Sequence, residues 1–262
     1  MFKSILSFFD KEYLFNPNVY GVRFFEEKED INASQQAEKV IYCFWTGDNP
    51  LTENRKNGLN SLVEKSKIKV VLITPDNLGN YILPDFPLHP AYQYLSLVHK
   101  SDYLRCYFMH HWGGGYSDIK PHNSHWDSAF DYLNRHSNII AVGYQESDPK
   151  DIGYMRSFVD KNKVKKINKD MKSNYKLVIG NCSYIFKPNT QFTKLWINEL
   201  NKRLDDNFDK LKLHPGNTMG DNEGYPLPWT SILGQIFHPL CLMFSKNISF
   251  DDNIKPIFKD YR

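Results

Sequence analysis

The chain has 262 residues, of which 41% are hydrophobic, 24% charged and 15% aromatic, and its formal net charge is +3. This composition excludes an intrinsically disordered chain, which is poor in aromatic residues, and a collagen-like chain. The length favours one domain with a large hydrophobic core over two smaller domains. Composition alone predicts that most aromatic side chains are buried and that only a few are left for a binding cleft.

Positive charge is concentrated in one segment. Residues 156–176 contain eight Lys or Arg and two Asp, a charge of +6, so the rest of the chain carries −3 (3 − 6). A patch this local argues against a nucleic-acid-binding surface spread over the fold. We interpret residues 155–176 as a basic, flexible loop, which is either simply solvated or in contact with an anionic acceptor or an anionic membrane surface.

The cysteines and the apolar runs bear on the compartment. Cys43, Cys106, Cys182 and Cys241 lie far apart, each in an apolar run, which predicts buried free thiols in a reducing, cytoplasmic environment. No stretch approaches the roughly 18 apolar residues that span a membrane. Residues 1–37 are interpreted as a helical extension whose apolar side either packs on the core or contacts the inner face of a membrane peripherally.

Strand-like and helix-like segments alternate along the chain. In chain order the patterns predict a strand at 40–45, a helix at 51–66, a strand at 69–74, an irregular connection at 83–90, a helix at 92–111, a strand at 116–119, a helix at 124–136, strands at 139–143 and 183–186, a helix at 190–204 and short elements near 230–237 and 240–250. This order predicts an α/β domain over residues 38–250 with a mainly parallel sheet, followed by a tail at 251–262.

The residues that carry chemistry lie in one block of the sequence. Asp102 and Arg105 are three apart in a predicted helix, so they share a face, and a run of glycines at 113–115 follows. We expect this run to allow a tight reversal and a close approach of the backbone to a ligand. Asp118 then ends a predicted strand, where open α/β sheets bind their ligands. The sequence therefore predicts that an acid, a base and a strand-end carboxylate converge at one sheet edge.

The order S-D-x-L-R, a helical stretch and then G-G-x-Y-x-D resembles the DXD-containing glycosyltransferases of family 32. Flanking segments over about residues 39–235 are similar to that family as well, including the first strand and the strand that begins near Asn181. The resemblance implies a GT-A fold, a Rossmann-like single domain, and a nucleotide-sugar donor. It also implies transfer with retention at the anomeric carbon and a Mn²⁺ or Mg²⁺ cofactor.

The resemblance also implies roles for individual residues. Asp118, Arg105 and Lys120 would be catalytic, and Asp118 would also contact the metal. The substrate-binding residues would be Trp45, Asp102, Tyr116, Asn181 and Trp229, with Trp45 stacked on the donor base.

One departure from the family pattern changes the chemistry. Lys120 stands where the family has the second, metal-binding Asp of its motif, and a protonated lysine repels a metal ion. Either Lys120 itself supplies the positive charge that stabilises the leaving diphosphate, or Asp118 holds a metal together with Asp221, Glu223 or His238, or activity is lost.

We therefore interpret the chain as a retaining, hexosyltransferase-like enzyme that transfers a sugar to a glycan or lipid-linked acceptor in capsular or other surface polysaccharide synthesis. Two alternatives stay open at this point: a non-catalytic relative that binds nucleotide-sugars or glycans, and a sugar-phosphate transferase that uses the same cleft. Histidines flank the motif, among them His110 and His122, but no Cys or Asp completes a zinc site with them, so we interpret them as helix-end and loop residues.

Overall fold

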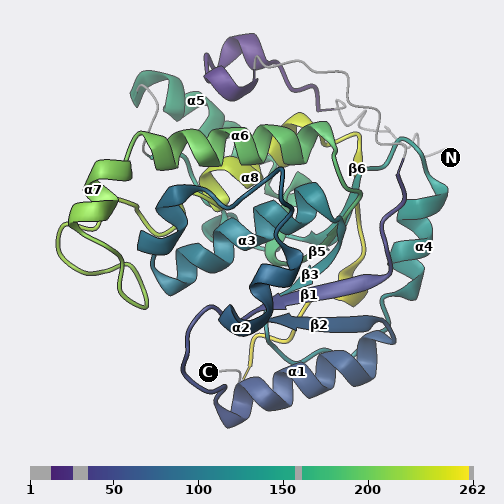
Figure 1. Ribbon diagram of the computed structural model, residues 1–262. Coiled ribbons are helices and arrows are strands. Elements are labelled where there is room, and N and C mark those ends of the chain that lie inside the picture. Colours follow the sequence, from purple (N-terminus) through teal and green to yellow (C-terminus); the bar gives the residue numbers. More distant parts are fainter. Residues whose placement is uncertain (1–12, 26–34, 157–160, 260–262) are drawn as a thin grey trace, which may run out of the picture.

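A six-stranded mixed sheet forms the centre of the molecule (Figure 1). The computed structural model describes residues 13–25, 35–156 and 161–259. The strands are β1 (Val40–Phe44), β2 (Lys69–Ile73), β3 (Gly114–Ser117), β4 (Ala141–Gln145), β5 (Ile179–Phe186) and β6 (Ile248–Phe250), and they lie in the order β2-β1-β3-β5-β4-β6. Strand β5 runs antiparallel to both of its neighbours, and the other three pairs are parallel. The predicted α/β class with a mostly parallel sheet is therefore confirmed.

Helices cover both faces of this sheet. Figure 1 shows α1 on one side and α3, α6 and α8 on the other. The helices are α1 (Glu53–Ser66), α2 (Pro75–Leu78), α3 (Leu97–His111), α4 (Asp127–Arg135), α5 (Lys161–Ser173), α6 (Gln191–Asp205), α7 (Phe208–Leu213) and α8 (Gly234–Met243). Seven short 3₁₀ helices lie at Pro17–Val19, Arg23–Phe25, Gly79–Tyr81, Pro90–Tyr94, Pro149–Asp151, Tyr175–Leu177 and Asp252–Ile254.

The alternation of side chains along β1 builds two hydrophobic layers. Val40, Tyr42 and Phe44 point into the larger core, which lies between the sheet and α3, α6 and α8. Ile41 and Cys43 point into a smaller core with residues of α1 and α4. Because both faces of β1 are buried, its sequence is continuously apolar, as expected of an internal parallel strand. Strand β2 lies at the outer edge of the sheet and is partly exposed.

The helix before the glycine run begins later than the prediction. Helix α3 starts at Leu97 because the hydroxyl of Ser96 accepts the backbone N–H of His99 and caps the helix. Residues Pro90–Tyr94 instead form a separate 3₁₀ helix. The following strand, predicted at 116–119, lies at Gly114–Ser117, so Asp118 directly follows its end.

The prediction of a basic loop was wrong for most of the segment. Residues Lys161–Ser173 form helix α5, in which Val164, Ile167 and Met171 are buried. These apolar residues recur at helical spacing, so they anchor one face of the helix to the core, while Lys165, Lys166, Lys169 and Lys172 are exposed. The short helix α7 was missed altogether.

The N-terminal extension can be described only in part. Residues 1–12 and 26–34 of the predicted helical segment 1–37 lie outside the described residues. The part that is described contains two 3₁₀ helices, Pro17–Val19 and Arg23–Phe25, and buries Phe24 and Phe25. Across residues 13–25, 35–156 and 161–259, none of the helices combines the length and the apolar character that a bilayer span needs. At the other end, Ile254 of the predicted tail is fully buried in the smaller core.

Candidate functional site

Helix α3 directs one polar face toward the carboxyl end of β1 and β3. Val98, Ser101 and Arg105 follow each other at spacings of three and four, so they lie on one side of the helix and line a cavity there. Asp102 is 4% exposed, and its carboxylate lies 3.7 Å from the Nε of Arg105. The predicted pairing of Asp102 and Arg105 on a helix face is therefore confirmed.

The end of β3 places Asp118 opposite this helix face. The backbone N–H of Asp118 donates to the carbonyl of Cys182 at 2.8 Å, which continues the pairing of β3 with β5. The glycine run acts at the other end of the strand. Gly113 and Gly114 have φ of 65° and 84°, and a Cβ on either would meet the backbone of a neighbouring strand or Pro188. The expectation that this run approaches a ligand was wrong, because the space around it is filled by the protein itself.

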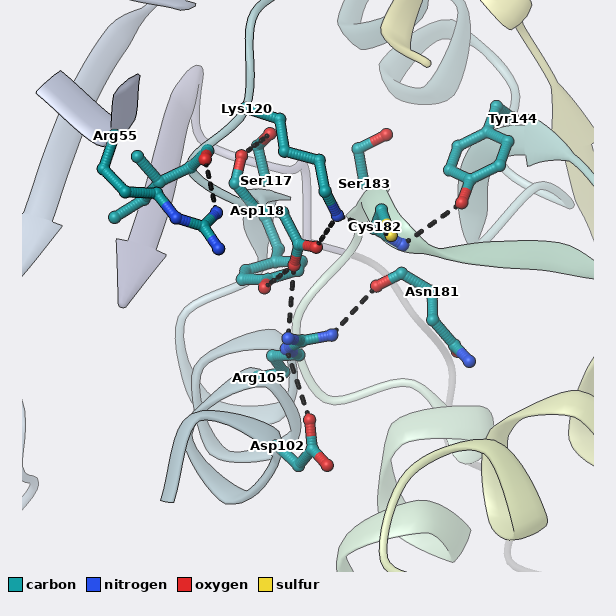
Figure 2. A network of polar contacts seen from close by, with 12 residues as sticks. Arg55, Asp102, Arg105, Ser117, Asp118, Lys120, Tyr144, Asn181, Cys182 and Ser183 are labelled. Carbon is teal, nitrogen blue, oxygen red and sulfur yellow. Dashed lines mark hydrogen bonds and ion pairs between the residues drawn. The ribbon is translucent and has the colours of Figure 1, made fainter. Parts of the chain in front are cut away.

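Five residues form a charged network, here named the Asp118 cluster: Asp102, Arg105, Tyr116, Asp118 and Lys120. Figure 2 shows Arg105 between Asp102 and Asp118, with Lys120 reaching Asp118 from the opposite side. Arg105 Nη2 lies 3.2 Å from Oδ1 of Asp118, and the same oxygen accepts the Tyr116 hydroxyl. Lys120 Nζ donates to Oδ2 of Asp118. Both carboxylate oxygens are thus occupied by donors.

The surroundings shift the pKa values of the two carboxylates of the cluster in opposite directions. Burial alone would raise the pKa of Asp118, but the charges of Lys120 and Arg105 hold it well below its usual range. Burial raises the pKa of Asp102 to about 6, because Arg105 offsets desolvation only in part and Asp118 adds a like charge. Asp118 therefore stays ionised at any physiological pH, whereas Asp102 titrates close to neutrality.

Arg105 is held in place by three independent contacts. Its Nη1 donates to the backbone carbonyl of Asn181 at 3.1 Å, and its guanidinium carbon lies 4.5 Å from the centre of the Tyr116 ring. Together with Asp118, these contacts fix the plane of the guanidinium group, and the side chain is only 12% exposed. A guanidinium that is buried, charged and fixed in orientation is suited to bind an anionic group of a ligand.

A cavity of about 280 Å³ opens beside the Asp118 cluster. Trp45 and Phe44 lie at its wall together with Tyr116, Arg105 and Asp118. A second cavity of about 290 Å³ also has Trp45 in its wall and adjoins the first through Gly47 and Asn49. The indole N–H of Trp45 donates to the carbonyl of Asn49 at 2.6 Å, which fixes the ring between the two cavities. The cavities therefore offer an aromatic surface at one end and fixed charges at the other.

Lys120 lies behind Asp118. Its side chain is 7% exposed, and Nζ also contacts the Sγ of Cys182 at 3.2 Å. Asp118 raises the pKa of this ammonium group although burial opposes the change, so the side chain stays charged. All four cysteines are free, as predicted, but Cys182 is only half-buried and touches this charged group. Cys182 lies in β5 next to the point where β3 ends, so the prediction of a plain buried thiol was wrong at this position.

Two predicted binding residues lie less directly at the site. Asn181 contributes its backbone carbonyl to Arg105, while its side-chain Oδ1 is buried without a hydrogen-bond partner in the described part of the chain. Trp229 is 54% exposed, and its carbonyl accepts a hydrogen bond from the ring of His99. The indole of Trp229 is thus a surface group rather than a wall of the 280 Å³ cavity.

The residues around Asp118 do not fit a divalent metal ion. Its carboxylate oxygens already accept bonds from Lys120, Arg105 and Tyr116, and two of these donors carry positive charge. Over the ranges that the structure describes, no three His, Cys, Asp or Glu side chains come together as metal ligands would. Hard cations such as Mg²⁺ need several oxygen ligands, and this site offers them ammonium and guanidinium groups instead.

The residues expected to complete a metal site are engaged elsewhere or exposed. Asp221 accepts a bond from Asn217 in an exposed loop, and Glu223 is exposed. His238 is fully buried, where its Nδ1 accepts the backbone N–H of Gly153. Two histidines near the motif make protein contacts, since His110 bonds Thr193 and His122 bonds Ser117.

Several residues of the cavity wall were missed by the sequence analysis. They come from three separate parts of the chain: Thr46 and Arg55, Ser101, and Thr218 with Met219. The last two arrive because the carbonyls of Asn217 and Thr218 accept the first backbone N–H groups of α3. Ser101 precedes Asp102 and lies four residues before Arg105, so it shares a helix face with Arg105. Among these missed residues, only Ser101 could have been found from local spacing.

Comparisons with known proteins add a remote likeness. No family model matches the chain, and no curated protein does either. Among solved structures, the chain is similar to one described as PaToxG Glycosyltransferase, with a TM-score of 0.36 and 13% sequence identity. That alignment covers 87% of this chain and 74% of the other. A likeness at this level carries no functional argument, so the assignment that follows depends on the geometry of the site.

Proposed function

We propose that the protein is a glycosyltransferase that takes a sugar from a nucleotide-sugar donor. The observation that carries this proposal is the pair of adjoining cavities, with Trp45 between them and Arg105 and Asp118 in the wall of one. A nucleotide-sugar needs an aromatic surface for its base, a positive charge for its diphosphate and carboxylates for its hydroxyl groups. These three features occur here side by side at the carboxyl end of the parallel strands, as in other α/β sheets that bind nucleotides.

Each residue has a role in this arrangement. Trp45 stacks on the base, and Arg105 binds the diphosphate. Asp118 accepts a hydrogen bond from a donor hydroxyl at Oδ2, whose partner in the described part of the chain is Lys120. Asp102 is proposed as the second acceptor for sugar hydroxyls on the strength of its contact with Arg105, since its own buried carboxylate lies behind the wall of the 280 Å³ cavity. Tyr116 and the carbonyl of Asn181 hold Asp118 and Arg105 in position.

The reaction we propose breaks the bond between the anomeric carbon and the phosphate oxygen. The electron pair of that bond leaves with the diphosphate, where Arg105 stabilises the negative charge as it develops. The acceptor hydroxyl attacks from the same face of the sugar, and its proton passes to the departing phosphate oxygen. This route retains the anomeric configuration and needs no general base from the protein. The acceptor is a hydroxyl of a glycan or of a lipid-linked glycan, as in surface polysaccharide synthesis.

The proposal is tested with purified protein and a panel of sugars linked to UDP, GDP, CDP or CMP. We expect one donor class to raise the melting temperature and to release its nucleotide on incubation, with the α or β configuration of the product read by NMR. The variant Arg105→Lys keeps the positive charge but loses the planar guanidinium, which can donate two parallel hydrogen bonds to one phosphate group. Nucleotide release should therefore fall at least 100-fold. Binding without release across the panel would instead indicate a non-catalytic relative, and phosphorus retained in the product would indicate sugar-phosphate transfer.

A second surface extends the proposal to the cellular location. Lys165, Lys166, Lys169 and Lys172 lie on the outer face of α5 and are exposed. The neighbouring segment, tied to α5 by a bond from the Tyr20 hydroxyl to Asp170, exposes Leu14 and Val19. Lysines beside exposed apolar side chains suit a surface of anionic lipids. We propose that the protein works in the cytoplasm and touches the inner membrane face through this surface.

A further inference from the structure

Two positive charges meet at one carboxylate of the Asp118 cluster. Arg105 and Lys120 both contact Asp118, one at each carboxylate oxygen. The second carboxylate, that of Asp102, lies farther off, 3.7 Å from the Nε of Arg105. Asp118 therefore has two cations beside it, in a place where solvent screens little.

The positions of the two cations relative to the cavity differ. Arg105 and Asp118 belong to the cavity wall, whereas Lys120 approaches Asp118 from the side of β5 and Cys182 (Figure 2). Lys120 thus balances the charge of Asp118 from behind. As a consequence, the guanidinium charge of Arg105 remains available to a ligand in the cavity, although Arg105 also touches Asp118.

We infer that Lys120 takes the place of a divalent cation, so that a nucleoside diphosphate binds this site without metal. This inference rests on the proposed function and specifies how its leaving group is stabilised. The physical reason is that a phosphate group needs local positive charge. Arg105 supplies this charge at the cavity wall, and Lys120 keeps it available by balancing the charge of Asp118 from behind. A metal ion would have to displace these donors from Asp118 and would meet two positive charges there.

The experiment compares nucleotide binding with EDTA and with Mn²⁺. UDP, GDP and CDP are titrated calorimetrically into the wild type and into Lys120→Arg, Lys120→Ala and Lys120→Asp. We expect the wild type to bind one of them about equally in EDTA and Mn²⁺, and Lys120→Arg to stay within about threefold. Lys120→Ala should bind about 10- to 100-fold more weakly, because Asp118 would then be balanced by Arg105 alone and less of the guanidinium charge would be available to the phosphates.

Lys120→Asp provides the sharpest outcome. It places a second carboxylate next to Asp118, so we expect it to bind nucleotide only with Mn²⁺ and to hold Mn²⁺ stoichiometrically, as seen by electron paramagnetic resonance. Lys187→Ala is the matched control, because Lys187 is a buried lysine that donates to the carbonyl of His136. It follows the end of β5 that pairs with the start of β3, away from Asp118, so nucleotide affinity should not change.

Two results would overturn the inference. One is wild-type nucleotide binding that disappears in EDTA. The other is stoichiometric Mn²⁺ binding by the wild type that the variant Asp118→Asn abolishes, and this Mn²⁺ titration decides even where no nucleotide binds. A protein that binds none of the three nucleotides in either buffer would remove the proposed function, while the Mn²⁺ measurement would still judge the charge arrangement. If Lys120→Ala does not fold, the wild type and Lys120→Arg suffice for the comparison.

Discussion

The Asp118 cluster and helix α5 use charge in opposite ways. In the cluster the charged side chains are largely buried and touch one another next to the end of β3, so each one alters the pKa of its neighbours. On α5 the lysines point to solvent from a helix that is anchored by three apolar residues. Buried charges that lose a partner are costly, whereas exposed charges contribute little to stability. In the proposed function the cluster would supply chemistry, which depends on precise positions, and α5 would supply a surface contact, which depends mainly on total charge.

Removal of Asp118 should give the largest effect. In Asp118→Ala, Arg105 and Lys120 remain buried side by side without the carboxylate that joins them. We expect donor cleavage to fall by at least about 10³-fold and the free energy of unfolding to fall by about 3–5 kcal/mol. Urea unfolding and nucleotide release measure the two effects. A variant with wild-type release would refute the role of the cluster.

The pH dependence of stability tests whether burial raises the pKa of Asp102. Its folded-state pKa of about 6 exceeds that of the unfolded chain, so the folded protein binds more protons between pH 4 and 6. Stability from this group is therefore present at low pH and is lost as the pH rises through that window, by about 3 kcal/mol in total. We expect Asp102→Asn to remove this loss, so that the variant gains stability relative to the wild type between pH 4 and 7.

The function should respond in the opposite direction. Asp102→Asn loses a carboxylate that we place on donor hydroxyls, so its nucleotide-sugar cleavage should be about 10-fold or more below that of the wild type. Unfolding curves in urea at several pH values measure the stability difference. A difference that does not vary with pH would mean that Asp102 is not perturbed by burial.

The exposed lysines of α5 should affect binding to anionic lipid but not the free energy of unfolding. Each lysine near anionic lipid contributes about 1 kcal/mol, so Lys166→Gln with Lys169→Gln should weaken binding to phosphatidylserine vesicles about 30-fold. The free energy of unfolding should stay within about 0.5 kcal/mol of the wild type. Vesicle sedimentation measures the affinity. Lys56→Gln with Lys65→Gln on α1 is the control, since both lysines are exposed on the other side of the sheet. Equal losses in the two double variants would mean that α5 has no special role.

The same contrast explains what could be predicted from the sequence. The pairing of Asp102 with Arg105 is a local property of one helix, and the position of Asp118 after a strand is local as well. The helical spacing of Val164, Ile167 and Met171 was also present in the sequence, but the high lysine content of the segment concealed it. Local patterns thus predicted that Asp102, Arg105 and Asp118 come together, and the apolar spacing within residues 161–173 was sufficient to predict α5.

Other features depend on contacts between distant parts of the chain. The antiparallel direction of β5 follows from its pairing with β3 and β4, and no pattern within Ile179–Phe186 encodes it. Likewise Thr218 and Met219 join the cavity only because their loop caps α3. The contact of Cys182 with Lys120 depends on the same strand pairing, so its exposure could not be inferred from the apolar run around it.

The smallest expected effect concerns how the cluster is supported from the far side of the sheet. Gly58 of α1 packs against the backbone of Lys120, and a Cβ at Gly58 would lie 3.1 Å from its carbonyl carbon and 3.2 Å from its Cα. Gly58→Ala gains up to about 1 kcal/mol of helix propensity, which offsets the strain of this contact. We expect nearly unchanged stability but about threefold weaker nucleotide binding, because the backbone that carries Lys120 must shift.

Gly79 provides the matched substitution for this test. It has a helical backbone, and a Cβ there would meet no other atom within 4 Å. Gly79→Ala should therefore leave nucleotide affinity unchanged, as measured by calorimetry on the same protein preparation. If Gly58→Ala and Gly79→Ala bind nucleotide equally well, the position of the Lys120 backbone does not matter. The ammonium group of Lys120 would then act through its charge alone, as the exposed lysines of α5 are expected to do.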